Sequence, residues 1–316
     1  MTEYFLILGD FALRVPQRIV WTESFDVAKI AEGLRRFGYT TVITHYEDPG
    51  LYRLIADLNI RYCLAATSWL RGYRALVNST LPALERSGVI LIPSLIHFLA
   101  YENKLLQAHL AKTLGLETPA SFAVATVEGL RRAAWALGYP VVVKCAEGYG
   151  SAQVSRVDSA SELEAVAECH FRERARGTGG VGSLVIQEFI PALPGDWKVI
   201  VVGDVAACLY RKVRPGDFRA SGSGLFEFKR APDAVLEFAY GVRRRLKVPW
   251  VSCDVAEWQE KCLLLEYQVV HFGTTTTDKP PFHLRRTCGK WRECSGPVEM
   301  EEEMALAVGQ YLGAES

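Results

Sequence analysis

Short apolar runs alternate with amphipathic stretches through the first ninety or so residues. The apolar runs occupy residues 4–8, 41–44, 62–66 and 89–92, and the amphipathic stretches include residues 26–37 and 71–85. Strands that alternate with helices in this way pair in parallel, and the helices cover the sheet. The alternation therefore predicts a parallel α/β sheet for the N-terminal part of the chain.

The turn after the first apolar run limits what this sheet can bind. Residues 9–13 read Gly-Asp-Phe-Ala-Leu and lack the GxGxxG pattern. Those glycines let a dinucleotide pyrophosphate approach the backbone at a helix N-terminus. A nicotinamide-dependent oxidoreductase is therefore the lowest-ranked class of enzyme, although the α/β pattern suits it.

The charges of the chain balance, with 36 Lys and Arg residues against 36 Asp and Glu residues in 316. Such a chain has no overall field that gathers polyanions, so its composition predicts neither a nucleic-acid nor a membrane partner. Glu3 and the short apolar run after it do not fit a secretory signal, and we expect a cytoplasmic protein. The eight cysteines form no CxxC pair, which favours reduced core residues over disulfides.

Three consecutive sections are predicted along the chain. A helix over residues 96–114, ended by Gly115, leaves the first section. The second is a smaller α/β unit with helices at 127–137 and 159–172 and strands at 141–144, 153–157 and 184–189. The third has helices at 233–246 and after Pro297, and strands at 197–202, 205–213, 251–257 and 262–266. We place the domain boundaries at residues 1–95, 96–195 and 196–316.

A glycine-containing turn in the second section is suited to hold a phosphate with its backbone amides. The turn carries Gly148, Gly150 and Ser151, and Lys144 ends the strand before it. A plain hairpin, which needs glycine for a positive φ, explains the same residues. No GxxxxGK[ST] pattern occurs in the sequence, so a P-loop is excluded.

Two carboxylates interrupt strongly apolar strands of the third section. Asp254 and Glu266 would each cost several kcal/mol there if they had no counter-charge. Gln268 lies two residues after Glu266 and on the same face of that strand, so the three side chains offer oxygen ligands suited to Mg²⁺. The alternative is an ion pair of the carboxylates with Arg211, Lys212 or Arg214.

A basic run at residues 211–214 ends a strand and precedes a loop of small residues at 217–224. Arg211, Lys212 and, within the loop, Arg219 are cations of the kind that neutralises a transferring phosphoryl group. A solvated basic turn is the alternative interpretation.

In their order along the chain, these residues resemble the ATP-grasp superfamily, and most of all its RimK-type glutamate ligases, glutathione synthetases and D-alanine-D-alanine ligases. The resemblance spans nearly the whole chain and rests on Lys104, Lys144, residues 148–152, residues 187–190, Asp196, Arg211, Asp254 and residues 266–268. It implies an α/β fold with an N-terminal Rossmann-like pre-ATP-grasp domain, a small central domain with a phosphate lid and an α+β C-terminal catalytic domain with a metal site.

The resemblance also implies where ATP lies, which is between the second and third sections. Its phosphates would contact Lys104, Lys144, Gly148, Gly150 and Ser151. Its adenine would meet Gln187, Glu188 and Ile190, and its ribose would meet Asp196.

The same resemblance implies the catalytic and metal-binding residues. Arg211 would face the γ-phosphate together with Lys144, and Lys212 or Arg219 would assist. One or two Mg²⁺ ions, for which Mn²⁺ could substitute, would be held by Asp254, Glu266 and Gln268. The chain departs from the family at two places, because Gln268 and Ser221 each stand where the family has Asn.

A chain of this family is expected to be a Mg²⁺- and ATP-dependent carboxylate-amine ligase. Such an enzyme forms an amide or peptide bond through an acyl phosphate and releases ADP and phosphate. The expected partners are small carboxylate and amine substrates of amino-acid or peptide type, and a second copy of the chain in a homodimer. A small-molecule kinase of the same fold and a degenerate ATP-binding regulatory protein are the alternatives.

Three segments are candidates for recognising the substrate. They are the loop with Arg14, Gln17 and Arg18, the basic segment 283–286 and the hydroxyls of residues 274–277. For the first two, a solvated surface is the more common explanation.

Overall fold

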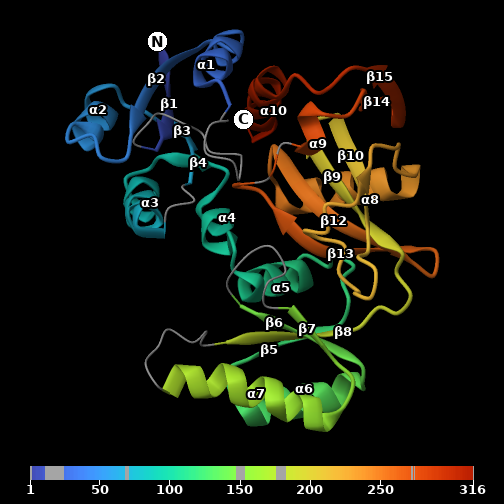
Figure 1. Ribbon diagram of the computed structural model, residues 1–316. Coiled ribbons are helices and arrows are strands. Elements are labelled where there is room, and N and C mark those ends of the chain that lie inside the picture. Colours follow the sequence, from blue (N-terminus) through green and yellow to red (C-terminus); the bar gives the residue numbers. More distant parts are fainter. Residues whose placement is uncertain are drawn as a thin grey trace.

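The computed structural model describes residues 2–10, 25–67, 71–146, 154–175, 183–271, 273 and 275–315. These residues form three sheets with helices packed around them (Figure 1). No helix in these ranges is both long and apolar enough to cross a membrane. The mixed α/β fold class predicted from the sequence is confirmed.

The first sheet is parallel and has the strand order β2-β1-β3-β4. Its strands are β1 (Glu3–Gly9), β2 (Tyr39–His45), β3 (Tyr62–Ala65) and β4 (Ile90–Ile92), and its helices are α1 (Val27–Arg35), α2 (Leu51–Asp57) and α3 (Arg71–Arg86). Asp26 begins α1, because its side chain accepts from the amides of Ala28 and Lys29. The parallel pairing predicted from the alternating pattern is confirmed, whereas α2, a helix of 7 residues, was not predicted.

The prediction of a single helix over residues 96–114 is wrong. The chain instead forms two helices, α4 (Leu95–Ala100) and α5 (Lys104–Thr113). Glu102 between them has a left-handed φ of 54°, which an α-helix does not accommodate. Asn103 then caps α5 by accepting from the amide of Leu106. The break places Lys104 at the N-terminus of a new helix that lines the cleft described below.

The second sheet is antiparallel, with the order β5-β8-β6-β7. Its strands are β5 (Ser121–Val124), β6 (Val141–Cys145), β7 (Val154–Val157) and β8 (Leu184–Glu188). The helices α6 (Val127–Leu137) and α7 (Ala160–Ala175) cover one face of it (Figure 1). Residues on the other face line the cleft described below. A core that includes Leu130, Val143 and Ile186 joins these helices to the sheet.

The third sheet is antiparallel and has the order β13-β12-β9-β10-β14-β15, with β11 paired to β10. Its strands are β9 (Gly195–Val202), β10 (Val205–Lys212), β11 (Phe226–Glu227), β12 (Trp250–Trp258), β13 (Lys261–Gln268), β14 (Phe282–Thr287) and β15 (Lys290–Ser295). The remaining helices are α8 (Asp233–Leu246), α9 (Thr275–Asp278) and α10 (Met300–Glu315).

Opposite faces of the third sheet pack on different helices. On one face Val199 and Val251 share a core with Val235 and Leu236 of α8. On the other face Ile200 and its neighbours share a core with α10, with α1 and with the first sheet. The alternation of side chains along each strand separates the two cores. The contacts of α1 with α10 therefore fix the first sheet to the third (Figure 1).

Candidate active site

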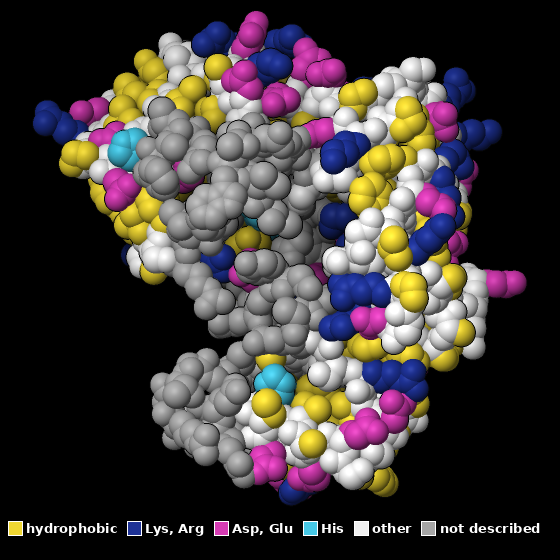
Figure 2. All heavy atoms as spheres, viewed as in Figure 1, with side chains coloured by type: hydrophobic (Ala, Val, Ile, Leu, Met, Phe, Trp, Pro, Cys, Tyr) yellow, Lys and Arg dark blue, Asp and Glu magenta, His cyan; other side chains and the backbone are white. Residues whose placement is uncertain are grey.

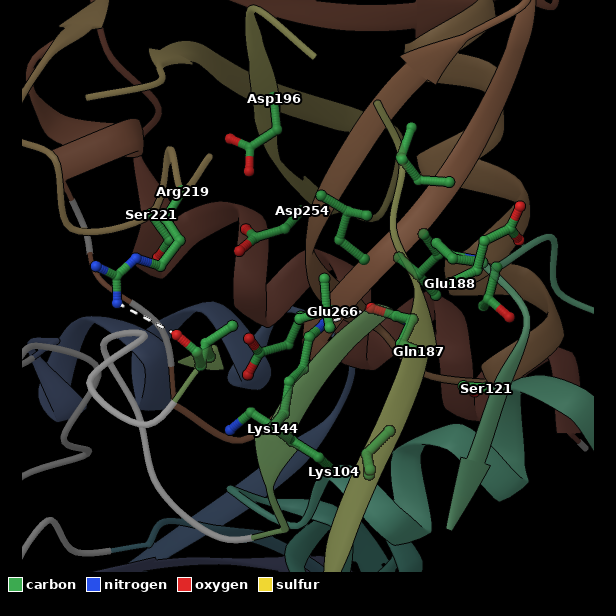
Figure 3. A pocket seen from close by; sticks show the side chains of 18 of the residues that line it. Lys104, Ser121, Lys144, Gln187, Glu188, Asp196, Arg219, Ser221, Asp254 and Glu266 are labelled. Carbon is green, nitrogen blue, oxygen red and sulfur yellow. Dashed lines mark hydrogen bonds between the residues drawn. The ribbon is translucent and has the colours of Figure 1, made fainter. Parts of the chain in front are cut away.

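A cleft lies between the second and third sheets (Figure 3). From the second sheet and α5 it is lined by residues that include Lys104, Val142, Lys144, Gln187, Glu188 and Ile190. From the third sheet and the loop after β10 it is lined by residues that include Gly195, Asp196, Arg219, Ser221, Asp254 and Glu266. The structure thus brings together residues that are more than 160 positions apart in the sequence, between Lys104 and Glu266.

Strand register sets a row of charged side chains across the third sheet. Arg211 on β10 stands opposite Asp196 on β9. Lys198, two residues further along β9, stands opposite Asp254 on β12, and Asp254 stands opposite Glu266 on β13. Residues two apart on a strand share a face, so this row crosses four strands on one side of the sheet.

Four of the five members of the row, all except Glu266, are joined by ion pairs. Arg211 donates from Nε and Nη2 to both oxygens of Asp196, at 2.6 and 2.8 Å. Its Nη2 also lies 2.8 Å from Asp254 Oδ2, and Lys198 Nζ lies 3.2 Å from Asp254 Oδ1. The alternative raised for Asp254, an ion pair with Arg211, is therefore confirmed. Charge-assisted contacts of this kind are the strong class of hydrogen bond.

Burial and charge move the pKa values of this group in opposite directions. Burial raises the pKa of Asp254, but the cations of Arg211 and Lys198 outweigh it and bring the pKa to about 2. At Asp196 burial outweighs the pairing with Arg211, so its pKa is raised. Burial lowers the pKa of Arg211, and the two carboxylates more than reverse that effect. Asp254 is consequently a carboxylate at every pH of interest.

Lys144, at the end of β6, is a half-buried cation on the opposite side of the cleft. Its Nζ donates to Gln187 Oε1 at 2.6 Å. Burial lowers its pKa to about 8, an effect that Glu266 opposes and the neighbouring Lys104 reinforces. The two lysines lie beside Glu266 in Figure 3. Lys144 therefore carries a poorly solvated charge next to open space, where an anionic ligand would compensate it.

Three residues were predicted as metal ligands, and the structure brings two of them into the cleft. Asp254 and Glu266 line it from facing positions on β12 and β13. Gln268 is not among the lining residues, and its Nε2 donates to Glu266 Oε1 at 3.0 Å. The described ranges hold no group of three or more His, Cys, Asp and Glu residues arranged for a metal. The two carboxylates fit a Mg²⁺ ion that takes its other ligands from phosphates and water.

The loop after β10 reaches across to the second sheet. Arg219 is bound to Asp217 at 2.7 Å, and its Nη1 donates to the carbonyl of Val154 on β7 at 3.5 Å (Figure 3). Next to it, the rings of Phe218 and Phe189 meet edge to face. The loop therefore closes one side of the cleft and presents Arg219 and Ser221 to it.

Two of the predicted nucleotide contacts take positions that the sequence did not indicate. Lys212 does not line the cleft, because neighbouring side chains on β10 point to opposite faces, and it is paired with Glu227. Glu188 lines the cleft, and one of its carboxylate oxygens accepts from the amide of Ala120 at 3.3 Å.

Several predicted residues lie outside the described part of the chain. They are Gly148, Gly150 and Ser151 of the phosphate turn, and Arg14, Gln17, Arg18 and Thr274 of the substrate candidates. Of the other substrate candidates, Thr276 and Thr277 are buried, with exposed fractions of 1% and 0%. Arg285 and Arg286 lie on β14 and are paired with Glu303 and Glu237.

Lys198 is the site residue that the sequence interpretation missed. It is the only charged side chain between Trp197 and Val202 in an otherwise apolar strand, which is the same signal that singled out Asp254 and Glu266. Its spacing of two residues from Asp196 places both on one face of β9. On the face of the molecule seen in Figure 2, further Lys and Arg side chains gather along the C-terminal part of the chain.

Comparison with known proteins agrees with this geometry. Residues 103–205 match the family model described as the ATP-binding domain of the carbamoyl-phosphate synthase L chain. A D-cycloserine synthetase has a TM-score of 0.61 at 15% identity, with 98% of this chain and 99% of that chain covered. A RimK domain ATP-grasp protein from Sphaerobacter thermophilus has a TM-score of 0.56 at 14% identity, with 97% and 98% covered. The chain therefore has the fold of these ATP-grasp structures, as its sequence predicted.

One curated protein shows similarity at the level of sequence. It is a tetrahydromethanopterin:alpha-L-glutamate ligase from Methanosarcina acetivorans, 32% identical over 147 residues. The match covers 43% of this chain and 43% of that protein. The similarity therefore extends over less than half of the relative's length.

Proposed function

We propose that this protein is an ATP- and Mg²⁺-dependent carboxylate-amine ligase. The observation that carries the proposal is the arrangement of charge around the cleft. The cation of Lys144 and the carboxylates of Asp254 and Glu266 line one cleft from two different sheets, and Arg211 is paired with Asp254. A nucleotide triphosphate with its metal ion is a ligand that needs both kinds of group at once.

The chemistry follows from the weakness of a carboxylate as an electrophile. A carboxylate oxygen of the first substrate attacks the γ-phosphorus of ATP, and the bond from that phosphorus to the ADP oxygen breaks. The amine of the second substrate then attacks the acyl carbon, phosphate leaves, and the amine loses a proton. ADP, phosphate and an amide are the products.

In this mechanism the residues of the chain neutralise negative charge and keep water away from the intermediate. Lys144 and Arg211 offset the negative charge of the transferring phosphoryl group, with Arg219 at the closing loop. Asp254 and Glu266 would hold Mg²⁺, which when bound neutralises phosphate charge and aligns the phosphates. The loop that carries Phe218 and Arg219 covers the cleft and limits the access of water to the acyl phosphate.

The same proposal includes the domain boundaries, the substrates, the cellular location and the oligomeric state. We place the domain boundaries at residues 1–95, 96–195 and 196–316, because each section has its own sheet. The substrates are small carboxylates and amines, and the relative named as an alpha-L-glutamate ligase makes L-glutamate the first amine to test. We further propose a cytoplasmic homodimer.

The test is ADP and phosphate release from Mg-ATP across amino acids, small peptides and polyamines, singly and in pairs, with mass spectrometry of each product. ADP that depends on two components, and a product formed from them by loss of water, supports the ligase. A phosphorylated single acceptor would instead identify a kinase. ATP binding without turnover in any mixture would indicate a regulatory protein.

A second experiment tests the metal assignment. Glu266→Ala removes one of the two carboxylates that face the cleft, and ADP formation should stop while the protein remains folded. Glu85→Ala on the exposed side of α3 is the matched control and should turn over normally. Normal turnover by Glu266→Ala would refute the assignment of Mg²⁺ to this position.

A further inference from the structure

The junction between α4 and α5 is held in a backbone conformation that its side chains do not favour. Glu102 has a left-handed φ of 54°, which a residue other than glycine adopts only at an energetic cost. Two residues later, Lys104 begins α5 and lines the cleft (Figure 3). A strained residue persists only where its surroundings hold it, so contacts that fix Glu102 also fix the start of α5.

An ion pair with α3 fixes Glu102. Arg74 on α3 donates from Nη1 to Glu102 Oε2 at 2.7 Å. The two side chains are only 18% and 13% exposed, so water and salt screen this contact less than they screen a surface pair. The guanidinium of Arg74 also lies over the ring of Tyr101, 4.8 Å from its centroid. Arg74 therefore contacts both of the residues that precede the cap of α5.

The same junction is tied to the other two sheets. The backbone amide of Lys104 donates to the carbonyl of Ala146, directly after β6, at 2.8 Å. The ring of Tyr101 meets the ring of His271 edge to face, with 5.7 Å between the centroids, and His271 follows shortly after β13. The junction thus lies where the three sections of the chain meet, and its conformation sets the direction in which the Lys104 side chain leaves the backbone.

The ion pair and the cleft are separate features of the molecule. Lys104 is among the residues that line the cleft, whereas Arg74 and Glu102 are not. An effect of this pair on a ligand in the cleft must therefore pass through the position of another residue, and Lys104 is two residues away from Glu102 in the chain.

We propose that Glu102, held by Arg74, is a positioning residue that directs Lys104 toward the phosphates of ATP. The inference rests on the proposed function, since it takes Lys104 to be a phosphate ligand. Without the ion pair the junction can leave the left-handed conformation, and Lys104 then loses its fixed direction toward the cleft.

The experiment measures the dissociation constant and the stoichiometry of the nonhydrolysable analogue AMPPNP by calorimetry with Mg²⁺ present. Lys104→Met should weaken binding by about tenfold or more, the scale of a lost hydrogen bond to a charged group. Glu102→Gln keeps the length of the side chain and removes its charge, and it should weaken binding by about threefold or more, the lower end of the scale for one hydrogen bond. In the Lys104→Met protein the same Glu102→Gln change should alter the affinity by less than about twofold, because the side chain that Glu102 positions is gone.

Glu303→Gln is the matched control. Glu303 is also 13% exposed and paired with an arginine, Arg285, and it is not among the residues that line the cleft. This variant should bind AMPPNP as the wild type does. If Glu102→Gln lowers only the melting temperature or the stoichiometry and leaves the dissociation constant unchanged, the pair is purely structural and the inference is overturned.

A second variant keeps the test sharp if Glu102→Gln leaves the charge of Arg74 without this carboxylate and does not fold. Arg74→Met combined with Glu102→Gln removes both charges, and this protein should also bind AMPPNP about threefold or more weakly than the wild type. Wild-type affinity in the double variant, or an equal effect of Glu102→Gln with and without Lys104, would overturn the inference while the proposed function stands. Absence of AMPPNP binding by the wild type would overturn both.

Discussion

The half-buried ammonium of Lys144 should make the free protein less stable than it would be with an apolar side chain at this position. Burial lowers the Lys144 pKa from 10.5 to about 8. At about 1.4 kcal/mol per pH unit, this fall corresponds to about 3 kcal/mol against the charged form in the folded protein. Lys144→Met removes the charge and shortens the unbranched side chain by one atom. It also leaves Gln187 Oε1 without its donor, which costs about 1 kcal/mol.

We therefore expect Lys144→Met to raise the free energy of unfolding by about 2 kcal/mol at pH 7. The sign of the pH dependence follows from the two pKa values. Below pH 8 both states of the wild type hold the proton, so the full penalty is present. Between pH 8 and 10.5 the unfolded chain holds more protons than the folded chain, so the wild type gains stability as the pH rises. The advantage of the variant should therefore shrink over this range.

Urea denaturation of both proteins at pH 7 and pH 10 measures the difference. Lys279→Met, at an exposed position, is the control and should change stability little at either pH. Mg-ATP should raise the melting temperature of the wild type and have a smaller effect on Lys144→Met, which would lack the proposed phosphate contact. A variant that is less stable than the wild type at pH 7, or a difference that does not depend on pH, would refute the reasoning.

Two further predictions follow from the charge of Lys144 and from helix packing. The affinity of the wild type for ATP should fall above pH 8, where Lys144 loses its proton, and Lys144→Arg should move that loss to higher pH, as calorimetry across pH would show. Gly33→Ala should lower the free energy of unfolding by about 1–3 kcal/mol in urea, because its new methyl group would collide with Ala305 Cβ where α1 meets α10. Gly72→Ala, with no atom within 4 Å of the added carbon, should be neutral or stabilising.

Local pattern determined much of the fold. The apolar runs and their spacing predicted the parallel first sheet, and turns and caps predicted most helices of the other two sections. Pattern failed where a local conformation outweighed the periodicity. The left-handed Glu102 divides one apolar stretch into α4 and α5, and nothing in the spacing of the apolar residues indicates that break.

The sequence also determined which residues carry charge into apolar surroundings. Asp254 and Glu266 were recognisable because an unpaired carboxylate in a buried strand is costly, and Lys198 carried the same signal. The need for a partner is a property of each residue and its neighbours in the chain.

Only the tertiary structure decided which partners meet. Strand register places Arg211 opposite Asp196 and Asp254 opposite both Lys198 and Glu266, and the packing of the second sheet brings Lys144 to the same cleft. A shift of one residue in any pairing would turn these side chains to the other face of the sheet. The sequence therefore specified the charges, and their pairing depends on contacts between strands that are distant along the chain.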